Sequence, residues 1–176
     1  MASYAREMMI TIIDTLYSFT IPASMRIDCG KGEMQMKQAY FYRCFDSDVL
    51  AVKPIIIEAL QYIQDALPAI ADNDMYELRL IFSELLFNAV IHGNQSDRNK
   101  NVRFSVDVRK ENVCAMISDD GEGYDYAEWI ETLAVPDELY SEHGRGIRLV
   151  KALADAIEFN PEGNAILFCK KVSLNG

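Results

Sequence analysis

Residues 102–118 contain two strand-like runs that lie too close together for any but an antiparallel pairing. Apolar and polar residues alternate from Val102 to Val108, which is typical of a strand with one buried face. The run over 113–118 is almost wholly apolar and predicts a more buried partner strand. Only residues 109–112 separate the two runs, and Lys110-Glu111-Asn112 among them are predicted to form a hairpin turn. The hairpin therefore argues against a doubly wound sheet in which strands and helices alternate.

Helical periodicity and turn residues predict the other elements. An aromatic strand is expected over 38–45 and a closing strand over 165–172. Helices are expected over 2–19, 74–92 and 145–157. A further helix is expected to begin after a cap at Asp46 or Ser47 and to end at Leu67, with Pro54 in its first turns.

Two boundaries of these elements carry local signals. Asp74 and Glu77 have the spacing of a capping box at the start of the helix over 74–92, and Gly93-Asn94 marks its end. Residues 119–143 form a long loop, with one short helical segment near 126–133. The order of elements predicts a two-layer α+β sandwich, in which helices cover one face of a mixed, mostly antiparallel sheet.

A chain of 176 residues has room for one domain of ordinary size. We assign this domain to residues 37–176 and an N-terminal helical extension to residues 1–36, with the boundary in the irregular stretch over 20–36. The extension could mediate dimerisation, cover the sheet or bind a partner. Packing on its own domain is the interpretation that we favour.

The charge balance separates several classes of protein. The chain carries 17 basic and 27 acidic residues, for a net charge of −10. This argues against direct binding of nucleic acid, which normally requires a basic surface. An acidic surface suits a basic protein partner, although solubility alone explains it more simply. The apolar run near the N-terminus is far shorter than a membrane span, so no membrane association is expected.

The four cysteines have neither the spacing of a zinc site nor that of a disulfide framework. Three of them, Cys44, Cys114 and Cys169, lie in apolar strand-like runs. We expect all of them to be reduced core residues, and we therefore favour a cytoplasmic location.

A polar stripe interrupts the most apolar helix of the chain. The helix over 76–92 is apolar on most sides, which is typical of a buried helix. Glu84, Asn88 and His92 are spaced four apart and so share one face. Because a buried carboxylate without partners is costly, this face is expected either to contact a ligand or to reach solvent along the helix edge.

Two glycine-containing segments follow. Asp119-Asp120-Gly121-Glu122-Gly123 comes directly after a buried strand, where an Asp can accept a hydrogen bond from an amino group and glycines permit positive φ and close approach. An ordinary acidic turn is the alternative. His143-Gly144-Arg145-Gly146 precedes a helix, whose N-terminal N–H groups suit phosphate. The alternative there is a flexible loop with a solvated Arg145.

The three segments together resemble the N, G1 and G2 boxes of the GHKL ATPase superfamily, which includes gyrase and the histidine kinases. Over roughly residues 38–173 the chain is most similar to the bacterial anti-sigma factor serine/threonine kinases. The matching residues are Glu84-x-x-x-Asn88-Ala89 with His92-Gly93-Asn94, Asp119–Gly123, His143–Ile147 with Leu149-Val150 and Leu153-Ala154-Asp155, and Gly163-Asn164 at the position of the final glycine box.

This resemblance implies the Bergerat fold and a set of residue roles. Glu84 would be the general base that takes a proton from a substrate serine. Asn88 would bind Mg²⁺, Asp119 would accept a hydrogen bond from the adenine amine, and residues 125–143 would form the lid over ATP. The implied ATP-binding residues are Asn88, Asp119, Gly121, Gly123, His143, Gly144, Arg145, Gly146 and Ile147.

The resemblance also implies a function in transcription regulation and the stress response. The chain would be a homodimeric, Mg²⁺- and ATP-dependent kinase that binds a sigma factor and phosphorylates a STAS-type anti-anti-sigma protein. Two alternatives remain open. One is a switch kinase that phosphorylates stressosome scaffold proteins and activates a phosphatase. The other is a nucleotide-sensing module without kinase activity, against which the intact Glu84 argues.

Overall fold

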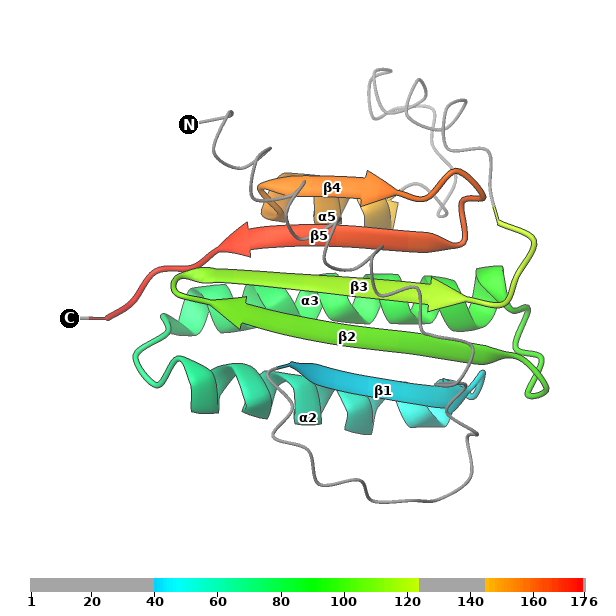
Figure 1. The fold of residues 1–176 in the computed structure, drawn as a ribbon, viewed down its shortest axis with the longest axis horizontal. Coiled ribbons are helices and arrows are strands. Elements are labelled where there is room, and N and C mark those ends of the chain that lie inside the picture. The colour runs from blue at the N-terminus through cyan, green and yellow to red at the C-terminus, as the bar shows by residue number, and fades with distance from the viewer. Residues whose placement is uncertain (1–39, 124–144, 176) are drawn as a thin grey trace, which may run out of the picture. The chain divides into compact units, whose positions relative to one another are not determined.

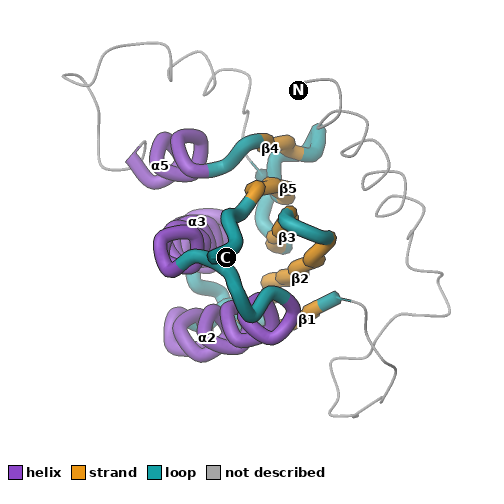
Figure 2. Tube along the Cα trace, turned by 90° about the vertical axis from the view of Figure 1, so that its left-hand side faces the viewer, coloured by secondary structure: helices purple, strands orange, loops and turns teal. Residues whose placement is uncertain are grey.

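The computed structural model describes residues 40–123 and 145–175, and within them five strands form one layer and three α-helices the other. Figure 2 shows the three helices on the same side of the strands. The elements, which Figure 1 labels in part, are β1 (Phe41–Asp46), α2 (Val49–Ala66), α3 (Asp72–Phe87), the π-helical turn η2 (Asn88–Gly93), β2 (Asn101–Arg109), β3 (Asn112–Asp119), α5 (Arg145–Leu153), β4 (Ala156–Phe159) and β5 (Ala165–Lys171).

The sheet has the strand order β1-β2-β3-β5-β4, and every neighbouring pair is antiparallel. The predicted two-layer α+β sandwich is therefore confirmed, and the described sheet contains no parallel pair. The predicted hairpin is confirmed too: β2 and β3 pair from Val102 to Arg109 and from Asn112 to Asp119. Lys110 makes the turn with a φ of 55°, and Asn112, which we expected in the turn, already belongs to β3.

Side chains from the inner face of the sheet and from α3 form the core. Phe104 in β2 and Phe168 in β5 are fully buried, and Phe82 in α3 lies between them. The ring centroid of Phe82 is 5.0 Å from that of Phe104 and 5.9 Å from that of Phe168. Tilted and edge-to-face contacts of this kind add to the burial of apolar area. The alternation predicted for β2 thus places its apolar residues against the helices.

Helix α2 agrees with the prediction except at its cap. Its N-cap is Asp48, whose Oδ1 accepts a hydrogen bond from Leu50 N at 3.0 Å, rather than Asp46 or Ser47. Pro54 lies in the second turn, as expected. The helix ends at Ala66, just before Leu67 and Pro68. The strand β1 extends through Asp46, which moves the helix cap one or two residues beyond the predicted position.

The predicted capping box on the following helix is wrong. Helix α3 begins at Asp72, and its N-cap Ala71 makes no side-chain cap. Asp74 instead turns to the end of β5, where it accepts a hydrogen bond from Ser173 N at 2.7 Å. Lys170 Nζ lies 2.6 Å from Glu77 and 3.5 Å from Asp74. Because Lys170 is almost fully buried, its charge needs these carboxylates more than the helix terminus does.

The predicted helix over 145–157 is too long. Helix α5 ends at Leu153, and Ile157 lies in β4, an edge strand that the sequence did not predict. Asp155 ends the helix by joining the sheet: its N–H donates to Cys169 O at 2.9 Å, and its Oδ2 accepts from Lys171 N at 2.6 Å. The unpaired edge of β5 therefore competes successfully with the last helical turn.

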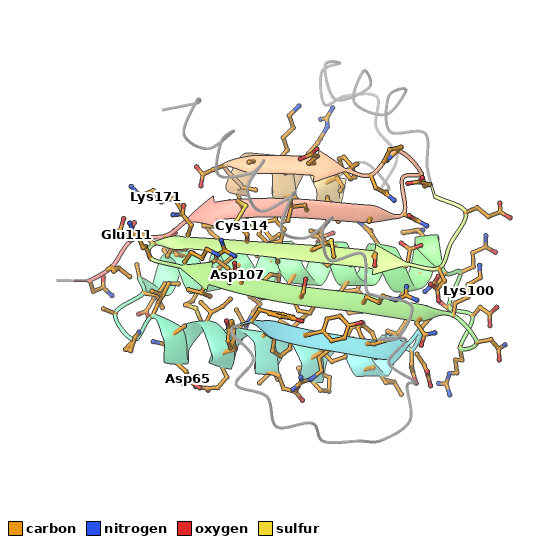
Figure 3. The ribbon with its side chains drawn as sticks, viewed as in Figure 1. Asp65, Lys100, Asp107, Glu111, Cys114 and Lys171 are labelled. Atoms are coloured by element: carbon orange, nitrogen blue, oxygen red, sulfur yellow. A yellow bond between two sulfur atoms is a disulfide. The ribbon has the colours of Figure 1, made fainter. Side chains whose placement is uncertain are left out.

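The prediction that all cysteines are reduced is wrong for one pair. Cys114 in β3 and Cys169 in β5 are directly opposite in the sheet, with Cα atoms 4.1 Å apart, and form a disulfide. Figure 3 shows this bond on the face of the sheet that the helices leave open. Cys44 forms no disulfide in the part of the chain that the structure describes. Since the cysteines carried part of the argument for the cytoplasm, that location stays a prediction.

Four expectations fall outside the described residues: the helix over 2–19, the boundary over 20–36, the helical segment near 126–133 and the lid over 125–143. The division of the chain at residue 36 therefore stays a prediction. Among residues 40–123 and 145–175, none of the helices has the length and apolar character that crossing a bilayer requires.

Candidate functional site

Two of the three polar segments lie at the same end of the sheet. The C-terminal end of α3 and the arrowhead of β3 point to the same side in Figure 1. Gly93, the last residue of η2, marks the contact, because a Cβ built on it would lie 2.5 Å from Asp119 Cγ. The backbone that follows the helix therefore runs directly past the carboxylate of Asp119.

The polar stripe of α3 runs from the interior to solvent. Glu84 and Asn88 are half-buried, and His92 is exposed. Asn88 also begins the π-helical turn, and its N–H is shared between the carbonyls of Glu84 and Leu85. Such π-helical insertions are frequent at functional sites, because they re-aim the residues that follow. The solvent interpretation therefore holds for His92, whereas ligand contact by Glu84 and Asn88 stays a prediction.

Helix α5 approaches the same stripe through Gly146. A Cβ on Gly146 would overlap Glu84 Oε2 and lie 3.1 Å from Glu84 Cδ. Only glycine allows the first turn of α5 to pass so close to the carboxylate. The structure therefore brings residues of the first and third predicted segments together. Among the described residues, no hydrogen bond is made by the side chains of Glu84 or Asn88.

The two neighbouring aspartates of the second segment have different environments. Asp120 accepts hydrogen bonds from Asn101 N at 2.8 Å and from the Arg103 guanidinium at 2.7 Å. Partial burial acts to raise the pKa of the Asp120 carboxyl, but these two donors outweigh it and hold the pKa below its usual range. Asp120 is therefore committed to holding β2 against the loop.

Asp119 keeps one oxygen available. Its Oδ1 accepts a hydrogen bond from Gly121 N at 2.8 Å, and no described residue donates to its Oδ2. Burial raises the pKa of the Asp119 carboxyl, and the charge of Asp120 adds to the effect; the bond from Gly121 and the charge of Lys100 oppose it. Figure 3 labels Lys100 at this end of the sheet. A half-buried acceptor of this kind is suited to an amino group of a ligand.

The glycines near Asp119 serve close approach more than positive φ. A Cβ on Gly121 would overlap the carbonyl oxygen of Gly93 and lie 2.6 Å from Asp119 Oδ1. Gly121 is therefore needed because two backbone segments touch there. Gly123 has the positive φ, +80°, that we predicted for this segment, and it packs on the carbonyl of Glu162.

The predicted third segment is only partly visible. His143 and Gly144 lie outside the described residues, as does the side chain of Arg145, whose backbone begins α5. Ile147 is buried in the hydrophobic core, so it holds α5 against the domain. Of the two residues of the segment that are fully described, Gly146 is the one that lies beside Glu84.

Sequence reasoning missed the importance of two asparagines. Asn94, which we interpreted as a helix stop and as part of the first matching segment, is fully buried. Its Nδ2 donates to Asn101 O at 3.0 Å, and its Oδ1 accepts from Asp120 N at 2.9 Å. Asn164, interpreted only as part of a glycine box, contacts Asp119 and Gly121. In a sequence, asparagines next to glycine indicate turns, and nothing local shows which backbone groups they bind.

The donor set fits a nucleotide with its metal ion. Glu84 and Asn88 offer carboxylate and carboxamide oxygens, which are the ligands that Mg²⁺ prefers alongside phosphate oxygens. Gly146 lies in the first turn of a nine-residue helix, beside Glu84, and backbone N–H groups in such a turn favour anions. Asp119 offers an acceptor for the base. The arrangement can therefore hold both ends of a nucleotide.

Comparison with known proteins gives one positive result. A family model described as "Histidine kinase-like ATPase domain" matches residues 50–170. The matched range includes Glu84, Asn88, Asp119 and Gly146. No curated protein matches the chain.

Proposed function

This chain belongs to the histidine kinase-like ATPase domain family, and from that premise we propose that it is an ATP-dependent protein serine/threonine kinase acting as an anti-sigma factor. One observation carries the proposal. The carboxylate of Glu84 lies one helical turn from Asn88 and against Gly146, and no described residue hydrogen-bonds to it. A module that only binds nucleotide has no need of a half-buried carboxylate at that place to which no described residue hydrogen-bonds.

The proposed chemistry assigns each residue one task. Asp119 accepts a hydrogen bond from the adenine amine, and backbone N–H groups in the first turn of α5 bind the phosphates. Asn88, with phosphate oxygens, would hold Mg²⁺, which would neutralise phosphate charge. The oxygen of a substrate serine forms a bond to the γ-phosphorus while the bond to ADP breaks, and Glu84 takes the hydroxyl proton. General base catalysis of this kind contributes about 10²–10⁴-fold to a rate.

The partners belong to the proposal as well. The chain binds a sigma factor, phosphorylates a STAS-type anti-anti-sigma protein and works as a homodimer in the cytoplasm. These assignments rest on the resemblance of the Glu84, Asp119 and Gly146 segments to the anti-sigma factor kinases. The acidic surface, with its net charge of −10, is compatible with a partner that has a basic face.

The first test separates binding from transfer. Mg-ATP is titrated into the full chain by calorimetry, alongside Asn88→Ala. Transfer from γ-labelled ATP is then measured to purified STAS proteins encoded near the gene, with Glu84→Gln and, as a matched control, Glu58→Gln on the exposed face of α2. We expect saturable binding that Asn88→Ala weakens, and transfer that only Glu84→Gln abolishes.

Each other outcome has a defined meaning. Absence of ATP binding would overturn the whole proposal. Binding without transfer to any serine substrate would overturn the kinase and support a nucleotide-sensing module. Transfer to a stressosome scaffold protein in place of an anti-anti-sigma protein would overturn the anti-sigma assignment and support a switch kinase.

A further inference from the structure

The turn between β4 and β5 is built around two asparagines. Asn160 Oδ1 accepts hydrogen bonds from Asn164 N at 3.0 Å and from Ala165 N at 2.9 Å. Asn160 Nδ2 donates to Asn164 Oδ1 at 2.8 Å. Because Oδ1 of Asn164 is bound on this side, its Nδ2 must point away from Asn160.

Asn164 touches the Asp119 loop at two points. Its backbone oxygen accepts from Asp119 N at 3.0 Å, and its Nδ2 donates to Gly121 O at 3.3 Å. The same turn supports the loop once more, since the carbonyl of Glu162 lies against Gly123. Asn164 therefore holds the residues on both sides of Asp120.

The backbone N–H groups of Asp119, Asp120 and Gly121 are all hydrogen-bonded. Asp119 N binds Asn164, Asp120 N binds the side chain of Asn94, and Gly121 N binds Asp119 Oδ1. With Oδ1 occupied, Oδ2 is the acceptor that remains to Asp119 among the described residues. The loop thus has little freedom to turn the carboxylate in another direction.

We propose that Asn164 is a positioning residue for base recognition, which holds Asp119 so that its Oδ2 accepts the exocyclic amine of adenine. The inference rests on the proposed function, because it assumes that Asp119 faces the base. Asn164 acts through the loop and need not touch the nucleotide. Holding the acceptor in place before binding removes an ordering cost that the ligand would otherwise meet.

The test compares ATP with inosine triphosphate, in which a carbonyl oxygen replaces the exocyclic amine. Calorimetry gives both dissociation constants for the wild type, Asn164→Asp and Asn164→Ser. Asn164→Asp keeps the shape and the acceptor for Asn160 but loses the donor to Gly121, whereas Asn164→Ser removes the side-chain bond without adding charge. Asn175→Asp, an exposed position near the C-terminus, is the matched control.

We expect the wild type to prefer ATP by about 10-fold or more, as a hydrogen bond to a charged group allows. Both Asn164 variants should reduce this preference by about 5-fold or more by weakening ATP binding while leaving inosine triphosphate binding nearly unchanged. Asn175→Asp should change neither constant. In an Asp119→Ala background, substituting Asn164 should no longer change the preference, because the acceptor that it positions is gone.

Several results would overturn the inference. One is an unchanged preference in both Asn164 variants that remain folded by urea titration. Others are an equal loss of affinity for both nucleotides, or an effect that persists without Asp119, either of which indicates a merely structural role. Failure of the wild type to bind ATP would instead overturn the proposed function, so the two failures are distinguishable.

Discussion

The two ends of helix α3 carry similar residues in opposite circumstances. At the N-terminal end, Asp74 and Glu77 both form ion pairs with the buried Lys170, and Asp74 also accepts a hydrogen bond from Ser173 N. At the C-terminal end, Glu84 and Asn88 are half-buried, and no described residue hydrogen-bonds to either side chain. We call these the structural end and the ligand end of the helix.

The two ends of α3 differ in whether the protein itself supplies partners for buried polar groups. Burying a charge is costly unless partners are supplied, and at the structural end the protein supplies them itself. At the ligand end the described residues supply no such partners, and under the proposed function the nucleotide and its metal ion would supply them. The disulfide between Cys114 and Cys169 lies beside the structural end along β5, because Cys169 directly precedes Lys170, but on the opposite face of the sheet. Contacts within the protein therefore stabilise the structural end, whereas the ligand end carries the groups that we propose for chemistry.

The same substitution at the two ends should have opposite consequences. Glu84→Gln should lower the rate of phosphoryl transfer by about 10²–10⁴-fold, because the general base is lost, and should leave the free energy of unfolding nearly unchanged. Glu77→Gln should lower that free energy by about 1–3 kcal/mol, because Lys170 loses a charged partner, and should leave transfer by folded protein intact. Urea unfolding of both variants measures the free energy of unfolding, and single-turnover kinetics measures the rate of transfer. Similar profiles for the two would remove the distinction.

Removing the buried cation should destabilise the structural end most. Lys170→Met leaves two carboxylates without their partner, and we expect a loss of about 3–5 kcal/mol in the free energy of unfolding. The neighbouring Lys171→Met, at an exposed position, should change it by less than about 0.5 kcal/mol. Denaturant titration measures both. A loss in Lys170→Met no larger than in Lys171→Met would show that the cluster contributes little.

Opening the disulfide should weaken the same end without affecting the ligand end. Cys114 and Cys169 are 55 residues apart in the chain, so the bond restricts the unfolded state over a long loop, which is worth about 2–4 kcal/mol. Reductant, or the double variant Cys114→Ser with Cys169→Ser, should lower the urea midpoint and leave the dissociation constant of ATP unchanged. Cys44→Ser should alter neither quantity. A change in ATP affinity on reduction would mean that the two ends are coupled.

Acid should weaken the ligand end through Asp119. Burial raises the pKa of its carboxyl, and the ionised form is the better acceptor for an amine. ATP affinity should therefore be complete above this raised pKa and fall as the pH drops through it. Calorimetry across pH should show this fall relative to Asp119→Asn, a comparison in which the titration of ATP itself cancels. Parallel pH profiles would show that the carboxylate does not contact the base.

The effect of Asp119 on folding has the opposite sign. Because its pKa is higher in the folded than in the unfolded chain, the ionised carboxylate destabilises the fold at neutral pH. This cost is complete above the raised pKa and disappears as the pH falls below the ordinary value for an aspartate. Asp119→Asn should consequently raise the free energy of unfolding slightly at pH 7, whereas Asp120→Asn, which loses partners, should lower it.

Sequence patterns predicted the elements that depend on local periodicity. The alternation over 102–108 and the closely following apolar run correspond to β2 and β3 almost to the residue. The four-residue spacing of Glu84 and Asn88 placed them correctly on one face of a helix. The errors came where groups distant in the chain bind a segment. Asp74 binds Lys170 and Ser173 and therefore does not cap its helix. Residues 156–159 pair with β5 and therefore form a strand in place of a helical turn.

The sequence by itself determined the two-layer fold and the residue types of the site, because periodicity, glycines and polar spacing are local properties. Only the tertiary structure decided which of two adjacent aspartates is available, which cysteines pair and which asparagines hold the loop. Those outcomes depend on neighbours far away in the chain, such as Arg103 for Asp120 and Asn164 for Asp119. The physical reason is that hydrogen bonds and burial are settled by proximity in space, which a local pattern does not contain.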